Sequence, residues 1–363
     1  MKSLLLGDIS PTIVTNPIFE KKDIDVLFND TVSLFEGNDI NFVNLECALT
    51  DSDSAIEKFG PNLKACGEVA DVLKSVGVNL CGLSNNHIFD FGKKGVEDTI
   101  KHLERCSIEY TGFGNNYADS RKNWIMEKDG EKLALIAVCE HEYSYALDNR
   151  MGSRPWDEFE TIDDIREAKR SADRVIVIYH GGKEHCRYPS PRLMKACRAM
   201  IKNGADVVLC QHSHCIGCYE NFEGGHILYG QGNFHFVKPV RSEIAETWNG
   251  CLAVKYDSTD NTIDFTPIIN REEGIEIAKG EEKEAIMSAF EKRNAQLSSG
   301  EWIKGWRQFC ESMKECYITN AQSVAGLDRD GIADSAFAHY LDCEAHTDVW
   351  RELFKTANYR NEL

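Results

Sequence analysis

Continuous apolar runs recur along the chain up to about residue 210, and few of them alternate with polar positions. Strands that are covered on both faces have this pattern, because helices pack on either side of a mostly parallel sheet. The runs predict buried strands over residues 3–6, 40–45, 78–83, 133–139, 175–179 and 207–210.

Between these runs, apolar residues recur at the spacing of amphipathic helices. This spacing predicts helices over residues 68–76, 95–105, 162–172 and 191–203, and Gly204 is a suitable helix stop. Strand and helix therefore alternate, which is typical of a layered α/β protein.

The chain changes character after this alternating part. Short apolar runs over residues 226–229, 251–256 and 263–269 are separated by turn residues, and they predict hairpins or an antiparallel sheet. From about residue 279 the pattern becomes helical and rich in Trp, Phe and charged residues.

We expect two parts in this chain. Residues 1–275 form an α/β domain, because the candidate site described below needs strand ends from most of this range in one unit. Residues 276–363 form a helical extension packed on that domain, since no Gly- or Pro-rich linker separates the two. The pattern leaves open whether the tryptophans of the extension belong to a core, an interface or a lid over the strand ends: Trp302, Trp306 and Trp350.

Acidic residues outnumber basic ones. The 363 residues include 59 Asp and Glu against 41 Lys and Arg, a formal net charge of −18. Such a charge repels nucleic acid and anionic membranes, so we expect no nucleic-acid partner. The first apolar run ends at Gly7-Asp8, and no later run reaches the roughly 20 apolar residues of a membrane span. We therefore expect a cytoplasmic protein without signal peptide or membrane insertion, and the sequence predicts no oligomeric state.

The 14 cysteines do not form a disulfide pattern. Most lie in or beside runs that predict strands or helices, where a thiol behaves as a small hydrophobic group. Cys215 and Cys218 have the spacing of a redox or zinc motif, but no second pair follows at the usual distance. Reduced, buried cysteines are the favoured interpretation.

Residues able to bind metal or move protons follow five of the predicted strands. The carboxyl ends of strands build the sites of open α/β sheets, so groups scattered in sequence converge there. In chain order these residues are Asp8; Asn44 and Glu46; Asn85, Asn86 and His87; His180, Glu184 and His185; and His212 and His214. Glu140, His141 and Glu142 follow another strand and are weaker candidates.

The residue types indicate divalent transition metals. Imidazole nitrogens combined with carboxylate and amide oxygens suit manganese, zinc, iron or nickel. A carboxylate such as Glu46 can bridge two ions about 3.5–4 Å apart, which is the spacing of two-metal hydrolytic sites. Two dications would also attract an anionic substrate in spite of the acidic net charge. We therefore expect two divalent ions, and an anionic small molecule or polymer as substrate.

Each group alone has a plainer interpretation. Asp8 can cap a turn, and Asn85 and Asn86 can hold left-handed backbone. His212 or His214 alone can be a buried structural histidine, although their spacing of two residues lets both act at one loop tip. A purely structural protein would need five strand ends to carry such groups by accident, so a metal site is favoured.

Six short motifs also occur in a particular order. They are Gly7-Asp8, Asn44-Leu45-Glu46, Asn85-Asn86-His87, His180-Gly181-Gly182-Lys183-Glu184, Gln211-His212-Ser213-His214 and Gly232-Asn233-Phe234. Together they resemble the CapA family of capsule and poly-gamma-glutamate synthesis proteins. That family is similar to the calcineurin-like metallophosphoesterases, and the resemblance covers about residues 3–240. The family usually has an aromatic residue where this chain has Gly181, and proline where it has Ser213; both changes leave the expected ligands intact.

The resemblance implies an α/β fold, a four-layer αββα metallophosphoesterase-like sandwich with a dinuclear metal centre between the sheet ends, here followed by the C-terminal helical appendage. It implies that His87 donates a proton to the leaving group or stabilises developing charge. By the same resemblance, Asp8 and His214 hold one metal ion, Asn86, His180 and His212 hold the other, and Glu46 bridges them. Residues expected to contact substrate or support the ligands are Ser10, Asn44, Asn85, Glu184, His185 and Asn233.

Ser10 departs from the wider phosphoesterase pattern, which usually carries a histidine two residues after the first aspartate. The first metal site is then short of one strong ligand. It can bind its ion more weakly, accept Ser10 or water, or recruit Glu184 or His185 from the loop after the fifth predicted strand. The alternative for Glu184 and His185 is a solvated rim that touches neither metal nor substrate.

Two functions from different classes fit these residues. The first is a metal-dependent hydrolase of a phosphoester or a related anionic ester or amide, connected with capsular polysaccharide or poly-gamma-glutamate metabolism. The alternative is a non-catalytic metal-binding accessory protein for synthesis of those polymers.

Overall fold

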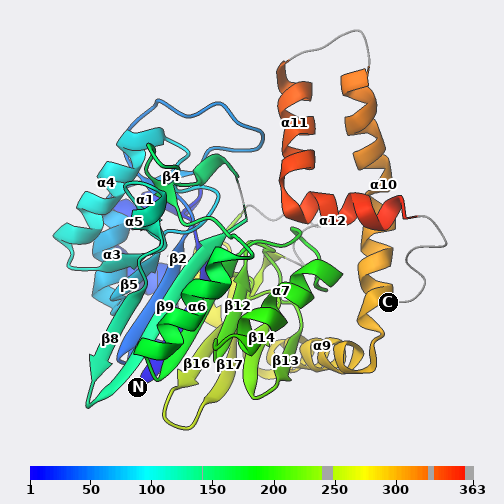
Figure 1. The fold of residues 1–363 in the computed structure, drawn as a ribbon. Helices are drawn as coiled ribbons and strands as arrows, with labels where there is room; N and C mark the ends of the chain where they lie inside the picture. Colours follow the sequence, from blue (N-terminus) through cyan, green and yellow to red (C-terminus); the bar gives the residue numbers. More distant parts are fainter. Residues whose placement is uncertain (141, 239–247, 326–330, 356–363) are drawn as a thin grey trace.

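The computed structural model describes residues 1–140, 142–238, 248–325 and 331–355, and its core consists of two large sheets packed face to face. Helices cover the outer face of each sheet (Figure 1). Apolar side chains from both sheets meet between them, including Leu5, Phe42, Ile176 and Leu209. The four-layer αββα sandwich expected from the sequence is confirmed.

The first sheet has eight strands, and β1 (Lys2–Ile9) lies in its middle. β1 pairs in parallel with β2 on one side and antiparallel with β16 on the other, and β15 pairs with its carboxyl end. The sheet is therefore parallel on one side and antiparallel on the other. The remaining strands are β2 (Ile40–Leu45), β5 (Leu80–Gly82), β6 (Glu109–Thr111), β15 (Asn233–His235), β16 (Gly250–Asp257), β17 (Thr262–Asn270) and β18 (Ile275–Ile277).

The second sheet has six strands in the order β13-β14-β12-β11-β9-β8. Its four central strands run parallel, and the two edge strands are antiparallel to their neighbours. The predicted strand near residue 226 forms a hairpin with β13, as expected, but it also extends this parallel sheet. The strands are β8 (Trp124–Lys128), β9 (Glu131–Cys139), β11 (Arg174–His180), β12 (Val207–Gln211), β13 (Tyr219–Phe222) and β14 (Gly225–Leu228).

Helices on the outer faces complete the sandwich. α3 and α4 share an apolar cluster with the first sheet, whereas α6 and α7 pack on the second. The helices of the sandwich are α1 (Asn16–Glu20), α2 (Ile24–Phe28), α3 (Glu68–Val76), α4 (Gly92–Arg105), α5 (Tyr117–Ser120), α6 (Glu160–Ser171) and α7 (Pro191–Lys202), with 3-10 turns η1 (Asn29–Phe35) and η2 (Glu142–Ser144). Short bridging strands are β3 (Ala48–Leu49), β4 (Lys64–Ala65), β7 (Phe113–Gly114) and β10 (Gly152–Ser153).

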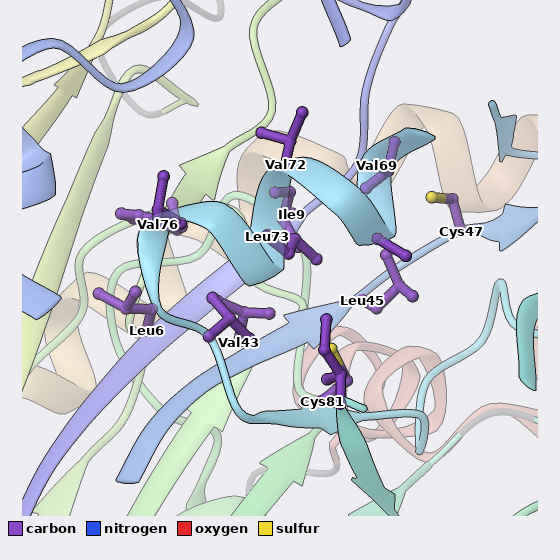
Figure 2. Close-up of a cluster of buried hydrophobic side chains, with 14 of the residues drawn as sticks. Leu6, Ile9, Val43, Leu45, Cys47, Val69, Val72, Leu73, Val76 and Cys81 are labelled. Atoms are coloured by element: carbon purple, nitrogen blue, oxygen red, sulfur yellow. The ribbon is translucent and has the colours of Figure 1, made fainter. Parts of the chain in front are cut away.

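Helix α3 shows how the sequence builds one of these layers. Its apolar residues recur at helical spacing and are buried on one face against β1 and β2, where Leu73 lies near Leu6 and Val43 (Figure 2). Gly77 ends the helix in the left-handed region at φ 102°, which glycine adopts without steric cost, and its N–H donates to the Leu73 carbonyl.

Truncating this buried face should destabilise the fold. We expect Leu73→Ala to lower the free energy of unfolding by about 2–5 kcal/mol, because the fully buried side chain leaves a cavity. Ser75→Ala on the exposed side of the same helix is the matched control, and it should change stability by less than about 0.5 kcal/mol. Urea denaturation measures both, and equal effects would contradict the packing described here.

Four further helices follow the sandwich: α9 (Gly280–Ser299), α10 (Trp302–Ala325), α11 (Gly331–Asp342) and α12 (Glu344–Leu353). α9 runs along β13 and β17, and α12 lies beside α10 and α11 (Figure 1). The helical C-terminal region expected from the sequence is confirmed. A division at residues 275/276 stays a prediction, since β18 crosses it.

None of the described helices combines the length and the apolar character needed to cross a membrane.

The cysteines agree with the interpretation that they are reduced and mostly buried. None of the 14, which all lie in the described residues, forms a disulfide, and all except Cys106 and Cys316 are buried.

Candidate metal centre

The carboxyl ends of β1, β2, β11 and β12 meet at one end of the sandwich. Register places Asp8 of β1 beside Asn44 of β2 in the first sheet, and His180 of β11 beside Gln211 of β12 in the second. The two sheets touch here, since Asn44 Nδ2 lies 3.1 Å from His180 Nδ1. The convergence expected from strand-end placement is therefore present.

Asp8 is fully buried at this junction. It accepts hydrogen bonds from Asn44 Nδ2 at 2.7 Å and from the backbone N–H of His212 at 3.0 Å. Burial raises the pKa of Asp8 to about 7, although both hydrogen bonds oppose the rise. Gly7 before it matters sterically, because a Cβ at this position would lie 2.3 Å from the Gly232 carbonyl oxygen.

Glu46 is the residue of the site that most needs a compensating cation. It is fully buried, and within the described part of the chain neither carboxylate oxygen has a hydrogen-bond partner. Burial raises the pKa of Glu46 well above its usual value, and the charges of Asp8 and Glu184 add to the rise. His180 Nε2 lies 3.4 Å from its Oε1. A buried carboxylate without hydrogen bonds is costly unless a cation compensates it, so this position fits a metal ligand.

Histidines surround Glu46 on two sides. Ligand atoms of Asp8, Glu46 and His180 lie within 4.8 Å of one another, and so do those of Glu46, His212 and His214. Glu46 belongs to both groups, which is the position of a bridging ligand. Asn86 Oδ1 lies 2.9 Å from His180 Nε2, so the predicted amide ligand joins the first group.

The two histidines after β12 are held by unusual backbone. His212 and His214 adopt φ values of 80° and 55°, in the left-handed region where non-glycine residues are strained. Asn233 Oδ1 of β15 lies 2.8 Å from His214 Nδ1 and accepts a hydrogen bond from it in the tautomer that carries the proton there. Burial lowers the pKa of His214 to about 3, so its ring is neutral, the form that binds metal.

His87 lies beside this group and is supported by an ion pair. Its Nδ1 is 2.6 Å from Asp90 Oδ2, and Lys58 Nζ is 2.5 Å from Asp90 Oδ1. Burial and the Lys58 charge lower the pKa of His87. Sequence reasoning missed both partners; the three-residue spacing to Asp90 could have revealed one of them.

A cavity of about 410 Å³ opens over these groups. Six of its lining residues were predicted for the site: Asn86, His87, Glu184, His185, His212 and His214. Lys58 and Lys238 add positive charge to the wall, and Tyr340 of α11 closes part of it. The C-terminal helices thus contribute to the cavity.

The tryptophans of the helical tail do not form that wall. Trp306 is buried, and Trp350 packs beside it in the cluster of α10, α11 and α12. Trp302 packs partly on the helices of the second sheet. Of the alternatives left open by the sequence, a core position describes Trp306 best.

Further predicted residues lie near the expected ligands. Asn85 donates to the Leu45 carbonyl at 2.8 Å and accepts from the backbone N–H of His87, which shapes that turn. Ser10 is buried near the thiol of Cys47 and does not line the cavity. His185 lies 6.2 Å from His214 between ring centroids.

Glu140 holds the loop after β11. Its carboxylate accepts from the Gly182 N–H at 2.6 Å, and it also binds Tyr179 and Arg192. The sequence placed it at a strand end without this role. His141 lies outside the described residues.

Comparison with known proteins identifies the family. The family described as "Bacterial capsule synthesis protein PGA_cap" matches residues 2–238. The chain belongs to this family. The CapA resemblance expected from the six motifs is thereby confirmed, and the matched region ends before the C-terminal helices.

Curated relatives agree with that assignment. The chain is 27% identical over 241 residues to the capsule biosynthesis protein CapA of Bacillus anthracis, covering 64% of this chain and 59% of the relative. It is 28% identical over 245 residues to the PGA biosynthesis protein CapA of Bacillus subtilis, covering 65% and 63%. The chain therefore spans less than two thirds of each of these PGA_cap relatives. A probable polyglutamine synthesis accessory protein of Mycobacterium tuberculosis is 24% identical over 208 residues, covering 54% of this chain and 55% of that relative.

Solved structures also align with parts of the chain. A 5'-nucleotidase precursor from Thermus thermophilus aligns with a TM-score of 0.44 at 13% identity, covering 74% of this chain and 55% of that one. A dimetal phosphatase from Danio rerio aligns with a TM-score of 0.34 at 8% identity, covering 59% and 93%.

Proposed function

We propose that this PGA_cap protein is a metal-dependent hydrolase of a phosphoester or a related anionic substrate, and that it acts in capsular polysaccharide or poly-gamma-glutamate metabolism. The observation that carries the proposal is Glu46, a buried carboxylate without hydrogen-bond partners among the described residues, shared by two groups of ligands. Such a group is stable when cations compensate it.

Two divalent ions fit this arrangement. Glu46 would bridge them, and the remaining ligands would be Asp8, Asn86, His180, His212 and His214. The distances group Asp8 with His180, and His212 with His214, whereas the family resemblance pairs Asp8 with His214. The division of ligands between the ions therefore stays a prediction, as does the choice among manganese, zinc, iron and nickel.

When bound, a pair of dications lowers the pKa of water and neutralises charge that develops on an anionic substrate. The chain supplies the proton transfer. With Nδ1–H donated to Asp90, the protonated form of His87 carries its second proton at Nε2 and would deliver it to a leaving oxygen. Burial and the Lys58 charge lower the pKa of His87, so this protonated form is a stronger acid, while a smaller fraction of His87 holds the second proton before the step.

The cavity wall favours an anionic substrate. Lys238 supplies positive charge to it, beside Lys58, which is paired with Asp90, and the acidic Glu184, although the chain as a whole carries a net charge of −18. Lys238 Nζ lies 3.5 Å from the Trp248 ring centroid, which holds this cation at the cavity. Its position suits a phosphate or carboxylate group of the substrate.

The test of this function is turnover that depends on metal. The purified chain is analysed for bound metal, then assayed with phosphomonoesters, phosphodiesters and poly-gamma-glutamate in the presence of manganese, zinc or nickel. We expect hydrolysis of one class that chelator removes and metal restores. Absence of turnover in every metal-loaded sample would overturn the proposal.

Replacing the proposed proton donor should separate catalysis from metal binding. We expect His87→Gln to lower kcat by about 10²–10⁴-fold, the usual contribution of a general acid, while metal content stays unchanged. His102→Gln, on the outer helix α4, is the matched control and should retain full activity. A His87→Gln variant with normal kcat would remove this residue from the mechanism.

A second candidate function is polymer binding without hydrolysis. One relative is described as an accessory protein of polyglutamine synthesis, and this observation favours a supporting role. It predicts full metal occupancy without turnover, together with metal-dependent retention on immobilised poly-gamma-glutamate. Retention that persists after chelation would contradict it.

A further inference from the structure

Three metal-ligating side chains meet at the corner between α11 and α12, away from Glu46. His339 lies in the last turn of α11, Cys343 precedes α12, and His346 lies in its first turn. One ligand atom from each lies within 4.8 Å of the other two. Cys343 and His346 are buried, and His339 is partly exposed.

We infer that this corner is a further metal site that binds one zinc ion, or a similar soft divalent ion, through His339, Cys343 and His346. A thiolate with two imidazoles is a donor set that suits zinc. Three protein ligands leave a fourth position for water or another group. The site shares no ligand with the proposed centre around Glu46.

The backbone brings the three ligands together. Their spacing of four and then three residues would place them on one face of a continuous helix. The helix instead breaks at Cys343, which has extended backbone at φ −72° and ψ 124°. The break turns α12 away from α11 while the ligand atoms stay in contact distance.

The surroundings orient the ligands as metal sites do. Tyr317 Oη lies 2.6 Å from His346 Nδ1, and ligating histidines usually have their other nitrogen held by such a hydrogen bond. With Nε2 as the ligating atom, Tyr317 sets the ring orientation. The ring of Tyr340 packs edge-on to His346, with 4.1 Å between centroids, and shields the corner from water.

The plainer alternative is a cluster of stacked rings. His339 lies 5.5 Å from Phe59 and 5.7 Å from Tyr143 between centroids, so its ring also packs on the sandwich. Stacking involves the rings of His339 and His346 and makes no prediction about the thiol of Cys343. Metal binding uses all three groups, so removal of the Cys343 thiol should abolish it. Ring stacking should survive the same change.

The site borders the cavity of about 410 Å³, because His339, Cys343 and His346 line it together with His87 and Glu184. An ion at the corner would hold α11 and α12 in the position where they close this cavity. It would also add a positive charge to the cavity wall.

Cobalt(II) is the probe that reports this site alone. A cobalt–thiolate bond gives a charge-transfer absorption in the near ultraviolet, and the proposed centre around Glu46 contains no cysteine. We expect the metal-stripped full chain to show this absorption on titration with cobalt(II). Cys343→Ser should lose it, and its zinc content after zinc loading should fall by one equivalent per chain.

Matched variants make the result specific. Cys316→Ser, an exposed cysteine on α10, should keep the absorption, and so should His180→Ala. His339→Gln keeps the thiol and lies at a partly exposed position, so it should fold normally and weaken cobalt binding at least tenfold. Circular dichroism checks the fold of every variant.

Two outcomes would overturn the inference: no thiolate absorption in the unmodified chain, or absorption that survives Cys343→Ser. Neither outcome bears on the proposed hydrolase activity. Conversely, absence of metal-dependent turnover with the thiolate absorption intact would overturn the hydrolase and leave this site standing.

Discussion

Replacing Glu46 with glutamine is expected to abolish metal binding at the proposed centre and reduce hydrolysis to background, while making the metal-free protein more stable. The two effects have opposite signs because the same carboxylate is needed by the cations and is costly without them. Glutamine has nearly the same volume, and its amide can donate to Asp8 or His180 nearby. Elemental analysis, activity and thermal unfolding in chelator measure the three quantities.

The gain in stability should depend on pH. The pKa of Glu46 is raised in the folded state, so the carboxyl is protonated at low pH and its burial then costs little. As pH rises from the unfolded pKa through the folded one, the metal-free unmodified protein loses stability relative to the variant. The difference in melting temperature should therefore grow as pH rises above 4.5, the usual pKa of a glutamate.

A control variant separates the effect of the buried position of Glu46 from the loss of one negative charge. Glu57→Gln, at an exposed site of the loop before β4, removes the same charge and should leave metal content, activity and stability unchanged. If Glu46→Gln retained its metal, or lowered the stability of the metal-free protein, Glu46 would not be the shared ligand.

Replacing Arg192 with alanine should destabilise the protein by about 3–5 kcal/mol, the cost of leaving buried charges unpaired. Arg192 of α7 binds Glu140, which is fully buried, and its Nε lies 2.9 Å from Asp348 of α12. The side chain thereby joins the loop after β11 to the C-terminal helices. Chemical denaturation measures the loss.

The same substitution should loosen α12. Ser190 also binds Asp348, at 2.6 Å, but a hydroxyl cannot replace the lost charge. We expect faster amide hydrogen exchange in residues 344–353 of Arg192→Ala. Arg198→Ala on the same helix breaks a partly exposed pair with Glu220 and should cost about 1 kcal/mol without affecting α12. Equal effects of the two variants would contradict the buried connection.

The apolar pattern was sufficient for a layered α/β fold and for the convergence of its strand ends, whereas the four-layer sandwich was implied by the family resemblance. Continuous apolar runs marked the central strands, because both faces of each sheet are covered. The polar residues at the carboxyl ends of β1, β2, β11 and β12 then met as expected, since parallel strands end at the same edge. β8 was not predicted, because its residues are half-buried or exposed at the edge of the second sheet.

Contacts made by loops and by the tail could not be predicted in this way. Lys58 comes from a segment without regular structure, so no periodicity links it to His87. The spacing of His339, Cys343 and His346 was visible, but the break at Cys343 and its position over the cavity depend on tertiary packing. Cys343 was therefore counted with the other buried cysteines.

The central position of β1 has a consequence for how the chain is made. β1 pairs with β2 nearby in sequence, but its other edge pairs with β16, where Lys2 lies opposite Asp257. During synthesis the backbone N–H and C=O groups on this edge of β1 stay unpaired until β16 has left the ribosome. Pairing over such a separation is slow, so the nascent chain exposes an unpaired strand for most of its translation and is open to aggregation or chaperone binding during that time.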